Sequence, residues 1–201
     1  MKNFVRLLLV VMSMSMCFSC SNYSETDLIQ DDLNKKGFVI DENGNKTVTV
    51  PFKADFFGTY TNIIFGTDSE CDDPYGCRIF VEFVGNATHL GNMTGDFEFC
   101  ACGPDNKYDA STSKMIAANG DILYVSVKGR VVPGRLDDHP EHVVSYWRDP
   151  FVILGGTGKF EGATGEGFTD DYNSSLHPGN TQHNWNGTIT IIVGNGKGKK
   201  K

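Results

Sequence analysis

The chain has 201 residues, a formal net charge of −7 and 39% hydrophobic residues, with 23 glycines and 7 prolines. This length suits one domain, and the sequence has neither the glycine period of collagen nor the heptads of a coiled coil. The acidic balance argues against a nucleic-acid partner, because neutralising phosphates requires a surface rich in lysine and arginine.

The N-terminal segment predicts export. Lys2 and Arg6 precede an apolar run from Leu7 to Met16. A run of about ten residues is shorter than the roughly 20 that span a bilayer, and with its basic start it is typical of a secretory signal peptide. We therefore expect residues 1–19 to be a signal peptide that is removed.

Cys20 lies just beyond the apolar run, after Cys17, Phe18 and Ser19, and precedes a polar, acidic stretch. This arrangement resembles the lipobox of bacterial lipoproteins, in which the cysteine becomes the lipidated first residue of the mature chain. The resemblance implies lipidation at Cys20, with Cys17 the weaker candidate, and a protein held in the bacterial cell envelope by a membrane anchor. An ordinary cleaved signal peptide is the alternative. Residues 20–46 are expected to form a flexible tether.

Residues 47–194 predict a single domain of β-strands. Stretches rich in β-branched and aromatic residues are separated by Gly, Asp and Asn, which is the strand signature, and no sustained helical period is present. The expected strands are 47–52, 56–65, 78–84, 97–100, 122–132, 143–147, 151–154 and 187–193. About eight evenly spaced strands favour an all-β fold, a closed or nearly closed antiparallel β-barrel, with a sandwich as the alternative. Residues 195–201 are expected to be a disordered basic tail.

Four cysteines fall inside this domain, namely Cys71, Cys77, Cys100 and Cys102. An even number in an exported chain predicts disulfides rather than a zinc site, whose characteristic spacing is missing. An antiparallel hairpin of 78–84 with 94–102 would place Cys77 opposite Cys100 or Cys102. Cys71 would then pair with the other one.

The segment 155–167 reads GGTGKFEGATGEG. It matches neither the phosphate loop nor the dinucleotide-binding motif, because Phe160 follows Gly158-Lys159 where Ser or Thr is required and the glycine spacing is wrong. We therefore interpret Gly155, Gly156, Gly158, Gly162 and Gly165 as a structural turn, with Phe160 closing one end of the barrel.

The run from Gly155 to Gly165 resembles a signature of the allene oxide cyclase-like and dirigent-like β-barrels. Ala87-Thr-His-Leu-Gly91, Ala117-Ala-Asn-Gly-Asp121 and Gly187-Thr-Ile189 stand in the order found in bacterial relatives of that group. The resemblance spans roughly residues 50–194. It implies an eight-stranded antiparallel barrel, often with an apolar cavity and often oligomeric. Plant members include a cyclase that isomerises a fatty-acid epoxide and proteins that steer radical coupling.

Glu82 is the one candidate catalytic residue. It shares strand parity with Phe80 and Val84, so if that face pointed into the barrel, Glu82 would be a buried acid able to transfer protons. A solvent-facing glutamate is the alternative.

We interpret the other polar residues as surface residues rather than catalytic or metal-binding ones. Asp96 and Glu98 alternate on one strand face and read as polar surface rather than as a glycosidase pair. His139 and His142 flank Pro140 in what we expect to be a solvated loop rather than a metal site. We expect no metal and no cofactor.

Together these features predict a lipid-anchored β-barrel of the cell envelope that binds a small apolar or amphipathic ligand without catalysis. The alternatives are a cyclase or isomerase acting on a lipid-like substrate and a structural or partner-binding module. The expected partners are the membrane, a small ligand and further copies of the chain.

Overall fold

The computed structural model describes residues 38–40 and 42–193, and these residues form strands and three short 3-10 helices. The strands are β1 (Val39–Ile40), β2 (Lys46–Phe65), β3 (Cys77–Ala87), β4 (Gly91–Ala101), β5 (Lys107–Tyr108), β6 (Thr112–Ile116), β7 (Ile122–Val127), β8 (Gly129–Arg130), β9 (Val132–Pro133), β10 (Val143–Trp147), β11 (Pro150–Gly156), β12 (Thr164–Thr169), β13 (Asp171–Ser174) and β14 (Asn180–Val193). The helices are η1 (Gly66–Ser69), η2 (Pro104–Asn106) and η3 (Gly158–Phe160).

Several sequence expectations concern other parts of the chain. The signal peptide, Cys20 and the basic tail lie outside the described residues. Strand β1 falls within the segment 20–46 that the sequence suggested as a tether, and it pairs with the start of β2. Within the described part of the chain, no helix is long and apolar enough to cross a membrane.

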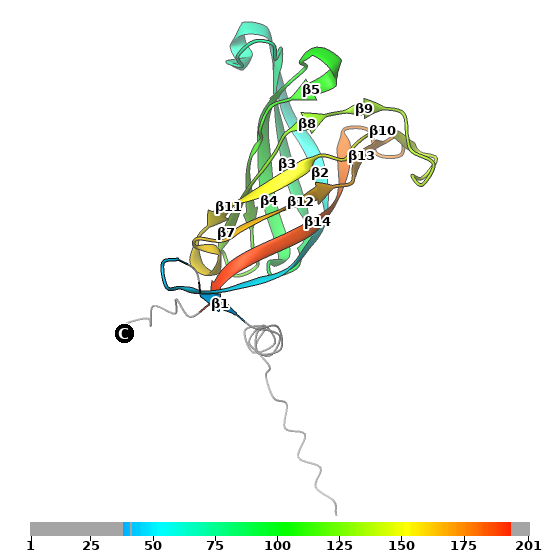
Figure 1. Cartoon of the computed structure of the whole chain (residues 1–201). Coiled ribbons are helices and arrows are strands. Elements are labelled where there is room, and N and C mark those ends of the chain that lie inside the picture. The colour runs from blue at the N-terminus through cyan, green and yellow to red at the C-terminus, as the bar shows by residue number, and fades with distance from the viewer. Residues whose placement is uncertain (1–37, 41, 194–201) are drawn as a thin grey trace, which may run out of the picture. The chain divides into compact units, whose positions relative to one another are not determined.

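Eight antiparallel strands close into a ring, which confirms the predicted barrel. Their order is β2-β3-β4-β6-β7-β11-β12-β14, and β14 returns to pair with β2 (Figure 1). The closing pair is long, running from Asn180 opposite Thr59 to Val193 opposite Lys46. Closure leaves these strands without a free edge, which removes the risk of edge-to-edge association.

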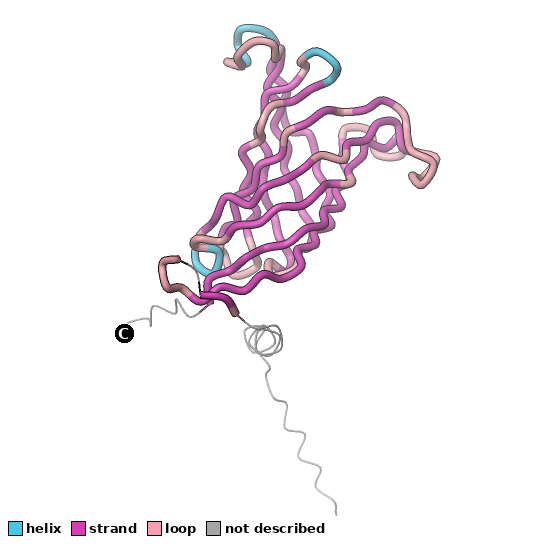
Figure 2. Tube along the Cα trace, viewed as in Figure 1, coloured by secondary structure: helices cyan, strands magenta, loops and turns pink. Residues whose placement is uncertain are grey.

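Three strands branch from the ring at one end. The other side of β14 pairs with β12 from Trp185 to Thr190, but with β13 at Thr181 and Gln182. The sheet continues from β13 to β10 and β9, which extend away from the barrel wall (Figure 2). This branch contributes side chains to one end of the interior.

Strand β2 shows why the interior is apolar. Its even-numbered side chains from Val48 to Phe56 are buried, whereas Lys53 and Asp55 face outward. The sequence predicted two strands here, 47–52 and 56–65, where the structure has one. The parity of Lys53 and Asp55 fits one continuous strand, since side chains in a strand alternate between its two faces.

Two strands of the ring, β6 and β12, were missed in the sequence. The β12 segment, TGEGFT, has two glycines and a glutamate among its six residues, so it lacks the apolar alternation of a typical strand. A Cβ at Gly165 would lie 2.2 Å from the carbonyl oxygen of Thr188, so the neighbouring strand passes too close for a side chain. Gly165 therefore allows β12 and β14 to pack closely, a role beyond the turn that the sequence predicted for it.

The glycine-rich segment joins β11 to β12 through η3. Gly155, Gly158 and Gly162 have φ values of 118°, 57° and 70°. A Cβ at Gly156 would lie 2.1 Å from the carbonyl oxygen of Ile122. Phe160 is completely buried, and η3 contacts β7, β11 and β14 at the end of the ring where β14 finishes.

Two disulfides join the segment before β3 and the end of β4, as the sequence predicted. Cys71 bonds to Cys100 and Cys77 bonds to Cys102. The β3–β4 register places Cys77 opposite Ala101, one residue from its partner. The start of β3 and the end of β4, which these bridges join, lie at the end of the barrel opposite η3 and near β5 (Figure 1).

Candidate functional site

An interior cavity of about 320 Å³ lies toward the disulfide end of the barrel. Small-molecule sites usually measure roughly 300–1,000 Å³, so this space suits a compact ligand. Its aromatic lining residues are Tyr60, Phe97, Phe99, Tyr108, Trp147 and Trp185. Its polar lining residues are Asn106, Ser111, Ser145, Asp171, Thr181 and His183.

The alternation of β14 brings three of these side chains together. Thr181, His183 and Trp185 share the inward parity of Ile189, and all four are buried. The apolar end of the strand packs near η3, whereas its polar beginning faces the cavity. One strand therefore supplies both core and site.

Asp171, on β13, carries a carboxylate that is 1% exposed. Its Oδ2 accepts hydrogen bonds from His183 Nδ1 at 2.8 Å and from Trp185 Nε1 at 3.1 Å. Its Oδ1 accepts a hydrogen bond from the backbone N–H of Asn184 at 3.1 Å. A buried carboxylate is costly unless it is hydrogen-bonded, and these three donors meet that requirement.

The imidazole of His183 is held from several sides. Its Nδ1 is engaged by Asp171, and its Nε2 lies 2.7 Å from Oγ1 of Thr181. The ring stacks on Phe56, with 4.4 Å between ring centroids and 8° between planes. The result is a hydroxyl–imidazole–carboxylate chain that lines an apolar cavity and can bind a polar group or transfer a proton.

Gly58 makes room for this chain. A Cβ at this position would lie 2.4 Å from Thr181 Oγ1, 2.9 Å from Val81 Cγ1 and 3.2 Å from His183 Nε2. A side chain here would therefore displace the Thr181–His183 pair. The glycine is required by space rather than by its backbone angles.

A second polar pair lies beside the cavity. The Tyr108 hydroxyl donates a hydrogen bond to Oδ2 of Asp149 at 2.8 Å, and the backbone N–H of Arg130 donates to the same oxygen at 3.2 Å. Burial raises the pKa of the Tyr108 phenol, and the nearby charge of Asp149 raises it further. Burial also raises the pKa of the Asp149 carboxyl.

Glu82 lies on the outer surface, so the hypothesis of a buried acid at this position is wrong. Val81 and Phe83 point inward, and Glu82 is exposed between Thr59 and Asp96 in the sheet. Both faces of β3 carry apolar residues, so its sequence alone does not distinguish inside from outside.

The other carboxylates considered in the sequence also lie on the outside. Asp96 forms an ion pair with Lys114 at 3.3 Å, and Glu98 forms one with Arg78 at 3.2 Å. Both pairs are partly exposed and join neighbouring strands, so they are surface contacts rather than a catalytic pair.

The loop before β10 is more ordered than the sequence suggested. His139 is buried, and Arg148 forms ion pairs with Asp138 and Asp170 that hold the loop against β13. The expectation of a solvated loop is therefore wrong for His139, whereas most of the surrounding loop residues are exposed to solvent. The part of the chain that the structure describes contains no group of three or more side chains suited to hold a metal ion.

The site residues themselves were missed in the sequence. Asp171, Thr181 and His183 belong to a polar stretch between the expected strands 151–154 and 187–193, where the sequence predicted no strand. A usable signal existed, because extending the parity of Ile189 backward along the strand places Trp185, His183 and Thr181 on the inner face.

No family model matches this sequence, and no curated protein matches it. Among solved structures, the chain is similar to a pterocarpan synthase dirigent protein, with a TM-score of 0.49 and 13% sequence identity over 77% of this chain and 93% of that chain. The closed ring of eight strands establishes the barrel independently of this similarity.

Proposed function

We propose that this protein is a lipid-anchored barrel of the bacterial cell envelope that binds a small amphipathic ligand in its interior without chemical change. The observation that carries the proposal is the cavity of about 320 Å³, whose wall is largely apolar and includes the Asp171–His183–Thr181 chain. An apolar wall with a few fixed polar groups is the usual composition of a ligand site.

The proposed location follows from the sequence. Cys20 stands where an apolar export signal ends, and lipidation there would anchor the chain because acyl chains bind membranes through their buried methylene groups. Mass spectrometry of the protein from a bacterial membrane fraction tests this part. Acyl chains on a chain that begins at Cys20 support it, and an unmodified or differently cleaved N-terminus contradicts it.

We also propose kinship with the allene oxide cyclase-like and dirigent-like barrels, on the basis of the glycine-rich run 155–165. Members of that group are often oligomeric, and this barrel exposes Val152, Leu154 and Phe168 on β11 and β12. Exposed apolar patches favour self-association. Sedimentation of the purified domain tests whether copies assemble.

The binding proposal has a convenient internal reporter. The chain contains 2 tryptophans, Trp147 and Trp185, and both line the cavity. N-phenylnaphthylamine is a neutral apolar dye that accepts excitation energy from nearby tryptophan. If the cavity binds ligands, the dye quenches tryptophan emission saturably and with about one dye bound per chain.

A matched pair of variants locates the dye. Val131 is a half-buried lining residue, and Val131→Phe reduces the cavity volume. Val84 is 59% exposed on the outer face, so Val84→Phe makes the same substitution elsewhere. Loss of quenching in Val131→Phe alone supports interior binding. Equal effects, or no saturable quenching in the wild type, contradict it.

A second function, isomerisation or cyclisation of a bound molecule, is favoured by the contact of Thr181 Oγ1 with His183 Nε2 at 2.7 Å. Such a chain can pass a proton to and from a ligand. Ligands extracted after incubation in deuterated water distinguish the two functions. Deuterium on carbon that depends on His183 indicates catalysis, whereas an unchanged ligand indicates binding alone.

A further inference from the structure

We infer that the cavity selects ligands whose interior polar group is a neutral or cationic hydrogen-bond donor, and that it rejects a carboxylate or other anion there. This inference rests on the proposed binding function and specifies its ligand class. It therefore separates alcohols and amines from fatty acids, which are also small amphipathic molecules.

The first observation is the sign of the charge in the cavity wall. Asp171 is the only acidic residue among the described lining residues, and no lysine or arginine is among them. Its carboxylate is 1% exposed, so water does not screen it effectively. A second anion beside it would be repelled at low local dielectric and would also lose its own hydration.

The second observation is the direction of the hydrogen bonds. The Tyr108 hydroxyl donates its proton to Asp149, so its oxygen presents lone pairs to the cavity. Asp171 accepts three hydrogen bonds, and a carboxylate has about four acceptor positions. The wall thus retains acceptors, which a ligand satisfies by donating a hydrogen bond.

Asp149 adds to the negative potential at this end. Its carboxylate is half-buried behind Tyr108, and its charge opposes ionisation of that phenol. The same charge opposes an anion placed next to Tyr108 from the cavity side. Two carboxylates therefore act in the same direction on any bound head group.

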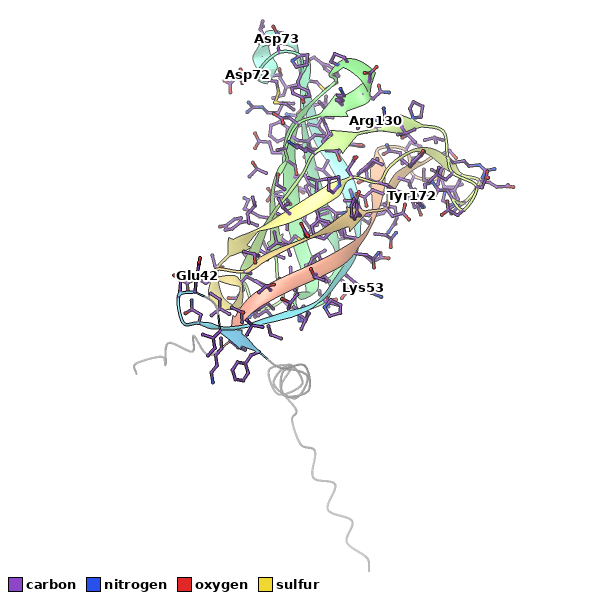
Figure 3. All side chains as sticks on the ribbon, in the orientation of Figure 1. Glu42, Lys53, Asp72, Asp73, Arg130 and Tyr172 are labelled. Carbon is purple, nitrogen blue, oxygen red and sulfur yellow. A yellow bond between two sulfur atoms is a disulfide. The ribbon has the colours of Figure 1, made fainter. Side chains whose placement is uncertain are left out.

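Among the described residues, the cationic side chains near the cavity lie farther out, at its rim. Arg130 on β8 lies opposite Lys107 on β5, at the disulfide end of the barrel (Figure 3). Both residues are exposed and neither lines the cavity. They could hold an anion at the rim but do not neutralise one bound inside. A carboxylate would therefore be attracted to the rim and repelled from the interior.

Three naphthalene probes of similar size test the inference by calorimetry. They are naphthylmethanol, naphthylmethylammonium and naphthoate, with unsubstituted naphthalene as the reference, at about pH 8, where imidazole side chains are ordinarily uncharged. We expect the alcohol and the ammonium ion to bind, and naphthoate to bind at least about tenfold more weakly than the alcohol. Naphthoate binding as tightly as the alcohol overturns the inference. If even naphthalene does not bind, the proposed binding function fails instead.

Two variants connect the selectivity to its cause. Asp171→Asn removes the interior charge and should reduce both the rejection of naphthoate and any preference for the ammonium ion over the alcohol. Naphthalene binding by this variant at wild-type affinity shows that its cavity is intact. Arg130→Gln should leave the ranking of the probes unchanged. A ranking that is set by Arg130, or that persists in an intact Asp171→Asn cavity, overturns the inference.

Discussion

The Nδ1 atom of His183 lies 2.8 Å from Oδ2 of Asp171, across a separation of 12 residues in the sequence. The register of β13 with β14 explains this contact. Tyr172 is opposite Gln182, and the neighbouring residues along the two antiparallel strands are Asp171 and His183. A hairpin at the edge of the ring thus brings a polar pair into an interior that is mostly apolar. The proposed function depends on the role of Asp171 and His183 in the wall of the cavity.

Replacing Asp171 by Asn should destabilise the fold. An amide offers one oxygen and one NH2 group, so at least one of the three N–H donors now facing Asp171 loses its acceptor. We expect a loss of about 1–3 kcal/mol in the free energy of unfolding, measured in urea. Asp96→Asn, on the outer face, is the control and should cost about 1 kcal/mol or less. Equal losses in the two variants would contradict the central role of Asp171.

Gly58→Ala should disturb the site without removing any polar group. Its Cβ would collide with Thr181 Oγ1 and Val81 Cγ1, so the Thr181–His183 contact must shift. Overpacking of this kind costs about 1–3 kcal/mol, and we expect weaker binding of N-phenylnaphthylamine. Gly76→Ala is the matched control, because its nearest neighbour would lie at 3.8 Å. Unchanged binding in Gly58→Ala would show that the pair does not shape the cavity.

The two disulfides should contribute similarly to stability but differently to binding. Removing either with paired serine substitutions should cost about 2–4 kcal/mol, because each bridge constrains the unfolded chain. Cys102 lines the cavity, whereas Cys71 and Cys100 do not. Dye binding measured under native conditions should therefore weaken when the Cys77–Cys102 bridge is removed and persist when the Cys71–Cys100 bridge is removed. The reverse pattern would place the ligand elsewhere.

The stability of the protein should depend on pH through Asp149. Burial raises the pKa of its carboxyl above the ordinary value of 3.8, so the folded state holds this proton more tightly than the unfolded state does. The contribution of Asp149 is therefore fully present below 3.8 and is lost as the pH rises through its folded-state pKa. Unfolding free energies of the wild type relative to Asp149→Asn should fall as the pH increases toward neutrality. A rise over the same range would indicate a lowered pKa.

The barrel could be predicted because its physical causes are local. β-Branched and aromatic residues identified most strands, and an even number of cysteines in a chain expected to be exported predicted disulfides, although it left their pairing open. The β12 strand could not be identified in this way, because Gly165 is required by the neighbouring strand: a Cβ at this position would lie 2.2 Å from the carbonyl oxygen of Thr188. The strand propensity of single residues takes no account of a contact with a neighbouring strand.

The site was harder to predict because it depends on which face of each strand is inside. On β3, Ile79 through Val84 are apolar on both faces except Glu82. Pairing with Gly58 and Tyr60 of β2 decides that Phe83 and Val81 face inward, and therefore that Glu82 faces outward. Which face of β3 lies inside therefore depends on how the whole ring closes, not on the β3 sequence alone.

The central claim is that the space beside Asp171 and His183 receives a small ligand. A crystal structure of the protein with N-phenylnaphthylamine tests it most directly. The account predicts electron density for the dye inside the barrel, in contact with Trp147, Trp185 and His183. An interior filled by side chains, with the dye on the outer wall or absent, would contradict it.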